Sequence, residues 1–230
     1  MPIFTSILLL LKWLFKRAKK CKIIAIDSNF EPATKMAFEF RNKFVYPWSV
    51  LCGYWILRAQ GNNANRNYVV SLLNSNQKVF YITGVGHGGY NIYTGQNYTE
   101  VFRVGNYNSS EVKDKVIHLL SCQTARDLGS DFVRNGCKAF FGYIENFTFT
   151  EEFSSIFFAC DSTIDYHFAL GRSAEQVYMI TRGVYNVGIN YLNDNGHFYV
   201  ASLLYDDLNY LRCPSSDVKW GDKNANIKIR

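Results

Sequence analysis

Short apolar runs alternate along this chain with longer segments of helical periodicity. The runs are rich in β-branched and aromatic residues and stop at glycine or polar positions, which is the pattern of buried strands. They occupy residues 22–26, 78–83, 115–121 and 138–143. Because strands that alternate with helices pack into a parallel sheet covered on both faces, we expect an α/β/α sandwich around a mainly parallel sheet.

Start and stop signals place helices between these runs. Pro32 suits the first turn of a helix that extends to about residue 44, and Ser173 and Gln176 form a capping box at the start of a long helix. A third helix is predicted for residues 124–135, with Gly136 at its C-terminal end.

The remaining segments give weaker patterns. Residues 47–60 fit a helix followed by a short strand, residues 92–105 fit a hairpin region, and residues 198–205 fit a final strand. No internal repeat or low-complexity linker interrupts the chain. We therefore expect a single domain over residues 22–230, preceded by an extension over residues 1–21.

The N-terminal extension is apolar over residues 3–15 and basic after that. A helix over the apolar stretch would be about 20 Å long, shorter than the roughly 30 Å hydrocarbon core of a bilayer. The charges also follow this stretch, whereas a secretory signal carries them before it. We expect a helix packed on the domain or a simple extension. The alternative is a peripheral membrane anchor through residues 3–20, with the basic residues on anionic lipid.

Charge and cysteine usage narrow the class of protein. Residues 12–22 supply the whole net charge of +6, because the rest of the chain carries 19 basic and 19 acidic residues. The body is therefore neutral and has no basic stripe for nucleic acid. The six cysteines occur singly, without CxxC spacing, which is typical of free thiols in a reducing compartment. We expect a cytoplasmic protein.

Two of the strong predicted strands each end at a reactive residue. The first leads into the glycine-rich segment around His87, and the second ends at Cys122. In open α/β sheets, sites form outside the carboxyl ends of the strands, so we expect the imidazole and the thiol to share a groove. A thiol becomes a nucleophile with the help of a base, usually histidine. The Gly88 N–H and the Cys122 N–H are the expected oxyanion donors.

Either residue alone carries little information, since a lone cysteine is more often a small buried apolar residue. Their joint placement favours a catalytic pair, and the surrounding segments resemble caspase-like cysteine peptidases. The resemblance covers roughly residues 22–228 and is nearest to the bacterial branch of gingipain-like and CHAT-type domains. Three internal segments carry it: VFYITGVGHGG at 79–89, IHLLSCQTA at 117–125 and GCKAFFGY at 136–143. The tail adds SLLY at 202–205, WGD at 220–222 and NA at 224–225, and it resembles the closing strand and the G-D-x-x-A motif of this branch.

The resemblance implies a caspase-like sandwich and a cysteine endopeptidase that cleaves a protein or peptide substrate in a signalling or defence response. Cys122 would attack the scissile carbonyl and form a thioester, and His87 would deliver a proton to the leaving amine. No cofactor, metal or nucleic acid is implied. Control would come from a partner protein, a bound ion or self-cleavage.

The sequence departs from relatives around the cysteine. Leu120 stands where metacaspases carry an aspartate that holds a basic P1 side chain. Caspases proper carry Gln-Ala before the cysteine and Gly two residues after it, whereas here Leu120-Ser121 precede Cys122 and Gln123-Thr124 follow it. Metacaspases have a second acidic residue in the pocket that binds the P1 side chain. Asp27, at the end of the first strand, could match this residue and bind substrate. Its alternative role is to cap the following helix. We expect a P1 preference for an apolar or basic residue over aspartate.

Other polar residues offer weaker sites. His118 lies inside an apolar run and is expected in the core. His167 and His197 have no partner at metal-ligand spacing, and Asp161 and Asp165 fit ordinary polar positions on the surface. Two alternatives to the peptidase stay open: a catalytically silent caspase-like scaffold, and a membrane-associated interaction module.

Overall fold

A six-stranded sheet forms the centre of the computed structural model, which describes residues 21–76 and 78–228. The strand order is β2-β1-β3-β7-β8-β9, and all neighbours are parallel except the edge strand β9. The predicted sandwich around a mainly parallel sheet is confirmed. The strands are β1 (Lys22–Asp27), β2 (Trp55–Gln60), β3 (Val79–Val85), β7 (Val116–Leu120), β8 (Ala139–Tyr143) and β9 (Leu211–Arg212).

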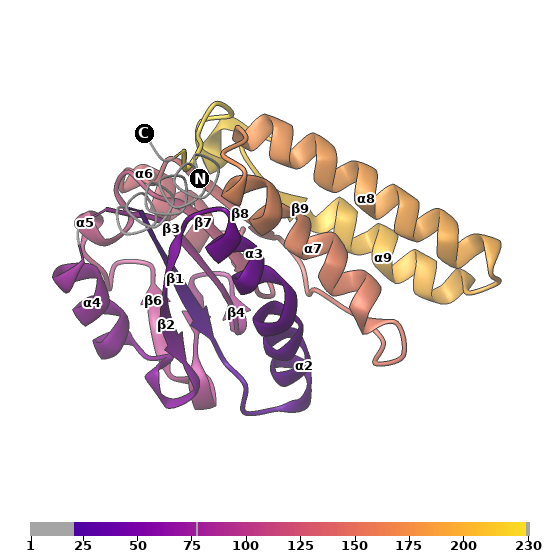
Figure 1. Ribbon diagram of the computed structural model, residues 1–230, viewed down its shortest axis with the longest axis horizontal. Coiled ribbons are helices and arrows are strands. Elements are labelled where there is room, and N and C mark those ends of the chain that lie inside the picture. The colour runs from indigo at the N-terminus through magenta and orange to yellow at the C-terminus, as the bar shows by residue number, and fades with distance from the viewer. Residues whose placement is uncertain (1–20, 77, 229–230) are drawn as a thin grey trace, which may run out of the picture.

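Helices cover both faces of this sheet (Figure 1). One layer contains α4 (Arg66–Ser75), α5 (Ser109–Val112) and α6 (Leu128–Arg134). The other contains α2 (Pro32–Phe40), α3 (Tyr46–Leu51), α7 (Ser154–Ala169) and α8 (Ala174–Asp194), with α9 (Phe198–Tyr210) packed against α8. A π-helical turn, Arg41–Val45, joins α2 to α3.

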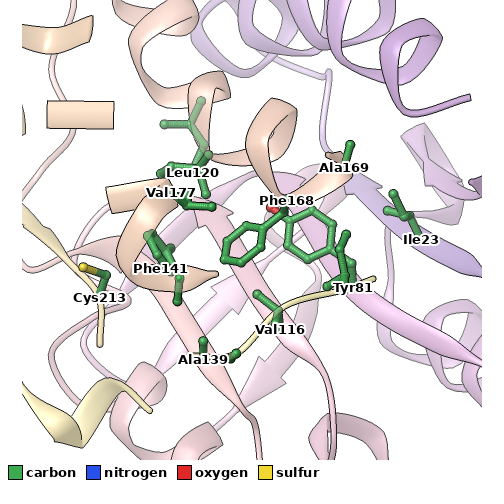
Figure 2. Close-up of a cluster of buried hydrophobic side chains, with 14 of the residues drawn as sticks. Ile23, Tyr81, Val116, Leu120, Ala139, Phe141, Phe168, Ala169, Val177 and Cys213 are labelled. Atoms are coloured by element: carbon green, nitrogen blue, oxygen red, sulfur yellow. The ribbon is translucent and has the colours of Figure 1, made fainter. Parts of the chain in front are cut away.

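Alternation along the strands builds a core on each face of the sheet. In β7, Val116 and Leu120 belong to the cluster under α7 and α8, whereas Ile117 and Leu119 belong to the cluster under α4 and α6. Figure 2 shows the first cluster, in which strand residues lie against Phe168 of α7. Because both faces are covered, β7 is buried at every position, as expected for a parallel strand.

A small antiparallel sheet follows β3 directly. It consists of β4 (His87–Gly89), β5 (Ile92–Thr94) and β6 (Glu100–Arg103), in that order. The hairpin expected for residues 92–105 is confirmed. His87 begins an extended strand of this sheet, so its position is fixed by pairing with Thr94 rather than left in a free loop.

Two predicted elements are wrong in type or length. Residues 198–205, expected as the closing strand, belong to helix α9, because Val200, Ala201 and Leu204 form one buried helical face. The helix expected over residues 124–135 begins only at Leu128, since the chain first makes a series of turns after Cys122. Gly136 does follow its end with a positive φ of 93°.

The interface between the sheet and α7 contains a fully buried charge network. Asp161 and Asp165, expected on the surface, are at most 1% exposed. The His118 ring lies 3.1 Å from Asp161 and 3.3 Å from Asp165, and the Arg41 guanidinium donates to Asp165 at 2.9 Å. His118 is therefore in the core, as predicted, and the two aspartates face it because α7 turns its polar stripe toward the sheet.

The predicted extension, residues 1–21, falls almost wholly outside the described part of the chain, so its helix and its membrane contact stay predictions. Within the described residues, no helix combines the length and the apolar character needed to cross a bilayer.

Candidate active site

The pairing of β3 with β7 places His87 and Cys122 at the same edge of the sheet. Val85 and Leu120 lie opposite each other at the carboxyl ends of these two parallel strands. His87 and Cys122 each follow two residues later along the chain. Gly86 keeps the strands together beyond this point by donating its N–H to the Leu120 carbonyl at 3.4 Å.

Both side chains line one pocket. The pocket has an empty volume of about 400 Å³ and opens between the N-terminal half of α2, the ends of β3 and β7, and residues 147–149. His87 is about one-third exposed and Cys122 is half-buried, so a substrate can reach either group. The sequence prediction that the imidazole and the thiol share a groove is therefore consistent with where the two residues lie.

Gly88 brings the two segments into direct backbone contact. A Cβ atom at this position would lie 2.2 Å from Ser121 Oγ and 2.4 Å from the Cys122 carbonyl oxygen. Both distances are far inside van der Waals contact, so only glycine fits here. The close approach sets the separation between the histidine strand and the cysteine turn.

The turn after Cys122 is fixed by the segment that follows β8. Gln123 has a positive φ of 60°, an uncommon conformation for a residue with a side chain. Its N–H donates to the Glu145 carbonyl at 3.1 Å, and Arg126 Nε donates to the Ile144 carbonyl at 2.7 Å. Arg126 also forms an ion pair with the Glu145 carboxylate. These bonds hold the backbone that presents the sulfur.

The surroundings of Cys122 favour the neutral thiol. Burial raises the pKa of this thiol, and a hydrogen bond from the Phe147 backbone only partly opposes the shift. A thiol in such a setting needs a nearby base to become a thiolate as it attacks.

Glu31, which the sequence analysis did not identify as a site residue, lies beside the histidine. Its Oε1 is 3.3 Å from His87 Nε2. The same carboxylate accepts the N–H groups of Thr34 at 2.7 Å and Ala33 at 3.1 Å, and so caps α2. Burial raises the pKa of Glu31, but these backbone hydrogen bonds and His87 outweigh it, so the carboxyl has a lowered pKa and stays ionised. The signal in the sequence was a carboxylate directly before Pro32.

Aromatic rings enclose the other sides of the imidazole. The Tyr98 ring lies at a centroid distance of 4.8 Å from His87, and Phe30 contacts both rings, at 5.9 Å from His87 and 4.9 Å from Tyr98. Together with Glu31, these contacts restrict the rotation of the histidine side chain.

Asp27 does not line the pocket. Its carboxylate is fully buried and accepts hydrogen bonds from Arg41 Nε at 3.3 Å, from Gln60 at 2.8 Å, and from the Tyr46 hydroxyl. The role in substrate binding therefore has no geometric support. The alternative role as a helix cap is wrong, because Glu31 caps α2.

The described residues contain one group with the geometry of metal ligands, namely His118, Asp161 and Asp165, whose ligand atoms all lie within 4.8 Å of one another. Arg41 already neutralises Asp165, and the Tyr143 hydroxyl donates to Asp161 at 2.8 Å, so the group acts as an internal ion network. His167 on α7 and the exposed His197 lie outside this group.

Comparison with protein-family models and with curated proteins finds no match to this chain. The candidate site is therefore defined by its own geometry: an imidazole and a thiol at the ends of adjacent parallel strands, a carboxylate beside the imidazole, and a pocket between them.

Proposed function

We propose that this protein is a cysteine endopeptidase in which Cys122 is the nucleophile and His87 the general acid–base. The observation that carries the proposal is that both side chains line one accessible pocket at the carboxyl ends of β3 and β7. The caspase-like resemblance of the surrounding segments adds to it. The substrate would be a protein or peptide, cleaved in a signalling or defence response in the cytoplasm.

The reaction follows from the chemistry of the two groups. The Cys122 sulfur attacks the scissile carbonyl while His87 takes the thiol proton, which gives a tetrahedral oxyanion. His87 then donates that proton to the leaving amine as the C–N bond breaks and a thioester forms. Water, deprotonated by His87, attacks the thioester, and the proton returns to the sulfur as the acid product leaves. The raised pKa of the resting thiol is compatible with this order of events.

The oxyanion needs two donors near the sulfur. We assign the Cys122 N–H, which donates to no other residue's backbone oxygen in the described part of the chain, and the Gly88 N–H of the adjoining strand. The close contact of Gly88 with the Cys122 carbonyl supports this pairing, because it brings the two backbone segments together.

Glu31 is a positioning residue in this scheme. The Glu31 carboxylate, 3.3 Å from His87 Nε2, would hold the ring at this nitrogen once the imidazole is protonated. The carboxylate would also stabilise the imidazolium that forms during attack. Since Glu31 is tied to two N–H groups of α2, its own position is fixed by the helix.

The test is cleavage of a peptide library by the full-length protein and its variants. We expect cleavage by the wild type and a loss of at least about a thousandfold in kcat/KM for Cys122→Ala and His87→Ala. Cys52→Ala, which removes another partly exposed thiol, should leave kcat/KM unchanged. Equal activity of the Cys122→Ala variant would contradict the assignment. Absence of any cleavage by the wild type would favour the silent scaffold.

A further inference from the structure

The pocket beside Cys122 has mainly apolar walls. Among the described residues, its lining is apolar apart from His87, Cys122 and the hydroxyl side chains of Thr34 and Ser121, and it includes no lysine, arginine, aspartate or glutamate. The apolar lining residues are Ala33, Ala37, Val85, Leu120, Phe147, Phe149 and Phe158.

Five segments of the chain supply this wall: α2, the ends of β3 and β7, residues 147–149, and α7. Ala33 and Ala37 lie one helical turn apart on α2, Phe158 comes from α7, and Phe149 packs edge-on against Phe158 at a centroid distance of 4.8 Å. The two alanines leave the space that larger side chains would fill.

The geometry of the proposed reaction indicates which part of the substrate lies in this pocket. A carbonyl carbon poised for attack lies roughly 3–3.5 Å from the sulfur. The side chain on the acyl side, P1, is attached one carbon away and stays with the enzyme in the thioester. A pocket that contains the sulfur in its own lining is therefore within reach of that side chain.

Charge near the pocket argues against a charged P1 residue. Glu31 is committed to the N–H groups of α2 and to His87, and Asp27 is held by Arg41 in the core. A buried guanidinium or carboxylate without a counter-charge costs several kcal/mol. An apolar side chain is instead stabilised when its surface is removed from water.

We infer that this pocket is the P1 specificity pocket and that it selects an apolar residue such as leucine, methionine or phenylalanine. The inference rests on the proposed peptidase function and names its substrate class. It narrows the expectation from sequence, which allowed a basic residue as well.

A peptide series that differs only at P1 tests this selectivity in the full-length protein. We expect kcat/KM for peptides with leucine or phenylalanine at P1 to exceed that for peptides with arginine or aspartate by at least about a hundredfold. The reason is that a charged P1 side chain would be buried in this pocket without a counter-charge. A second series that varies only P1′ should give a much flatter profile.

Substitution of Ala33 tests whether this pocket sets the preference. Ala33→Leu fills it and should shift the ratio of alanine to phenylalanine cleavage at P1 at least tenfold toward alanine. Ala33→Glu adds a carboxylate near the first turn of α2, where the helix dipole favours it, and should raise the ratio of arginine to leucine cleavage at least tenfold. Lys35→Leu, a substitution of an exposed residue on the same helix, should leave both ratios unchanged. Thermal unfolding checks that each variant is folded.

The outcomes separate the two proposals. Cleavage that depends on Cys122 but favours arginine or aspartate at P1, or that selects mainly at P1′, overturns the pocket assignment and leaves the peptidase intact. Ratios that do not move in either Ala33 variant also overturn it. If no peptide in either series is cleaved and Cys122 is not labelled by an electrophilic peptide, the peptidase itself is wrong.

Discussion

Glu31 Oε1 lies 3.3 Å from His87 Nε2, on the edge of the pocket that also contains Cys122. Glu31 is at the same time the N-cap of α2. One carboxylate thus connects the orientation of the proposed catalytic base to the helix that forms the pocket wall. Movement of α2 would change both the histidine and the P1 pocket.

Replacement of Glu31 by glutamine should lower kcat with little effect on KM. Glutamine keeps one oxygen, which can accept one of the two α2 N–H groups, but it removes the negative charge beside the imidazolium. We expect a loss in kcat of roughly tenfold to a hundredfold, measured with a P1-leucine peptide over a range of pH.

The matched control for this change is Glu39→Gln, since Glu39 is an exposed carboxylate on the same helix. It should retain wild-type kinetics. Equal kinetics of Glu31→Gln and Glu39→Gln would show that Glu31 acts only as a helix cap.

Substitution of Gly88 should separate the two reactive segments. A methyl group in Gly88→Ala would overlap Ser121 Oγ and the Cys122 carbonyl oxygen, so one strand end must shift. Because a displacement of about 1 Å is enough to lower a rate roughly a hundredfold, we expect at least that loss in kcat/KM with a folded protein.

Gly183→Ala is the control for this substitution. Gly183 lies within α8, and nothing lies within 4 Å of an added Cβ atom, so the change should keep activity and stabilise the helix by about 0.5–1 kcal/mol. Full activity of Gly88→Ala would contradict the close contact that the site depends on.

Sequence patterns predicted the parts of the fold that depend on local signals. The apolar runs became β1, β3, β7 and β8, and the capping box of Ser173 and Gln176 does begin α8. His87 and Cys122 were identifiable because each follows a strong strand, and parallel strands end at one edge.

The missed features depend on tertiary partners. Helix α7 turns two aspartates toward a buried histidine and arginine, so its polar residues look solvent-facing until the partners are known. Residues 198–205 are rich in strand-forming side chains, and only the spacing of Val200, Ala201 and Leu204 indicates a helix. Glu31 approaches His87 through the fold, not through sequence proximity.

The buried network makes stability depend on pH. Burial lowers the pKa of His118, but Asp161 and Asp165 raise it further, to about 9. Since this value exceeds the unfolded value of about 6.5, the network stabilises the protein fully below pH 6.5, and this contribution is lost as the pH rises to 9. In urea unfolding, His118 should contribute a fall on the order of 3 kcal/mol across that window, in addition to the contribution of Asp207 described below.

His118→Gln removes the titrating group and isolates this effect. The variant should be less stable than the wild type at pH 6, and the difference should shrink toward pH 9. Parallel stability profiles for the two proteins would contradict the paired, protonated imidazole.

Asp207 should produce a second pH dependence near the pocket. Burial raises its pKa to about 9, although the Thr148 N–H, which donates to its Oδ1 at 3.1 Å, opposes the shift. A carboxyl that stays protonated in the folded state costs stability as the pH rises from about 4, where the unfolded chain ionises, toward 9.

Asp207→Asn keeps the acceptor for Thr148 and removes this cost. Its stability relative to the wild type should increase steadily from pH 4 upward, including the range below pH 6 where His118 contributes no slope. The exposed neighbour Asp206 provides the control as Asp206→Asn, which should follow the wild-type profile. An unchanged difference between Asp207→Asn and the wild type would contradict the raised pKa.

The identity of the nucleophile is the central claim, and covalent labelling of the full-length protein tests it most directly. A peptide with leucine at P1 and a thiol-reactive electrophile at its carboxyl end is mixed with the protein, and the modified cysteine is identified by peptide mapping over time. We predict that Cys122 reacts at least tenfold faster than Cys52, the other partly exposed thiol, and that His87→Ala removes this advantage. Equal labelling of Cys122 and Cys52, or a rate at Cys122 that does not depend on His87, would contradict the account.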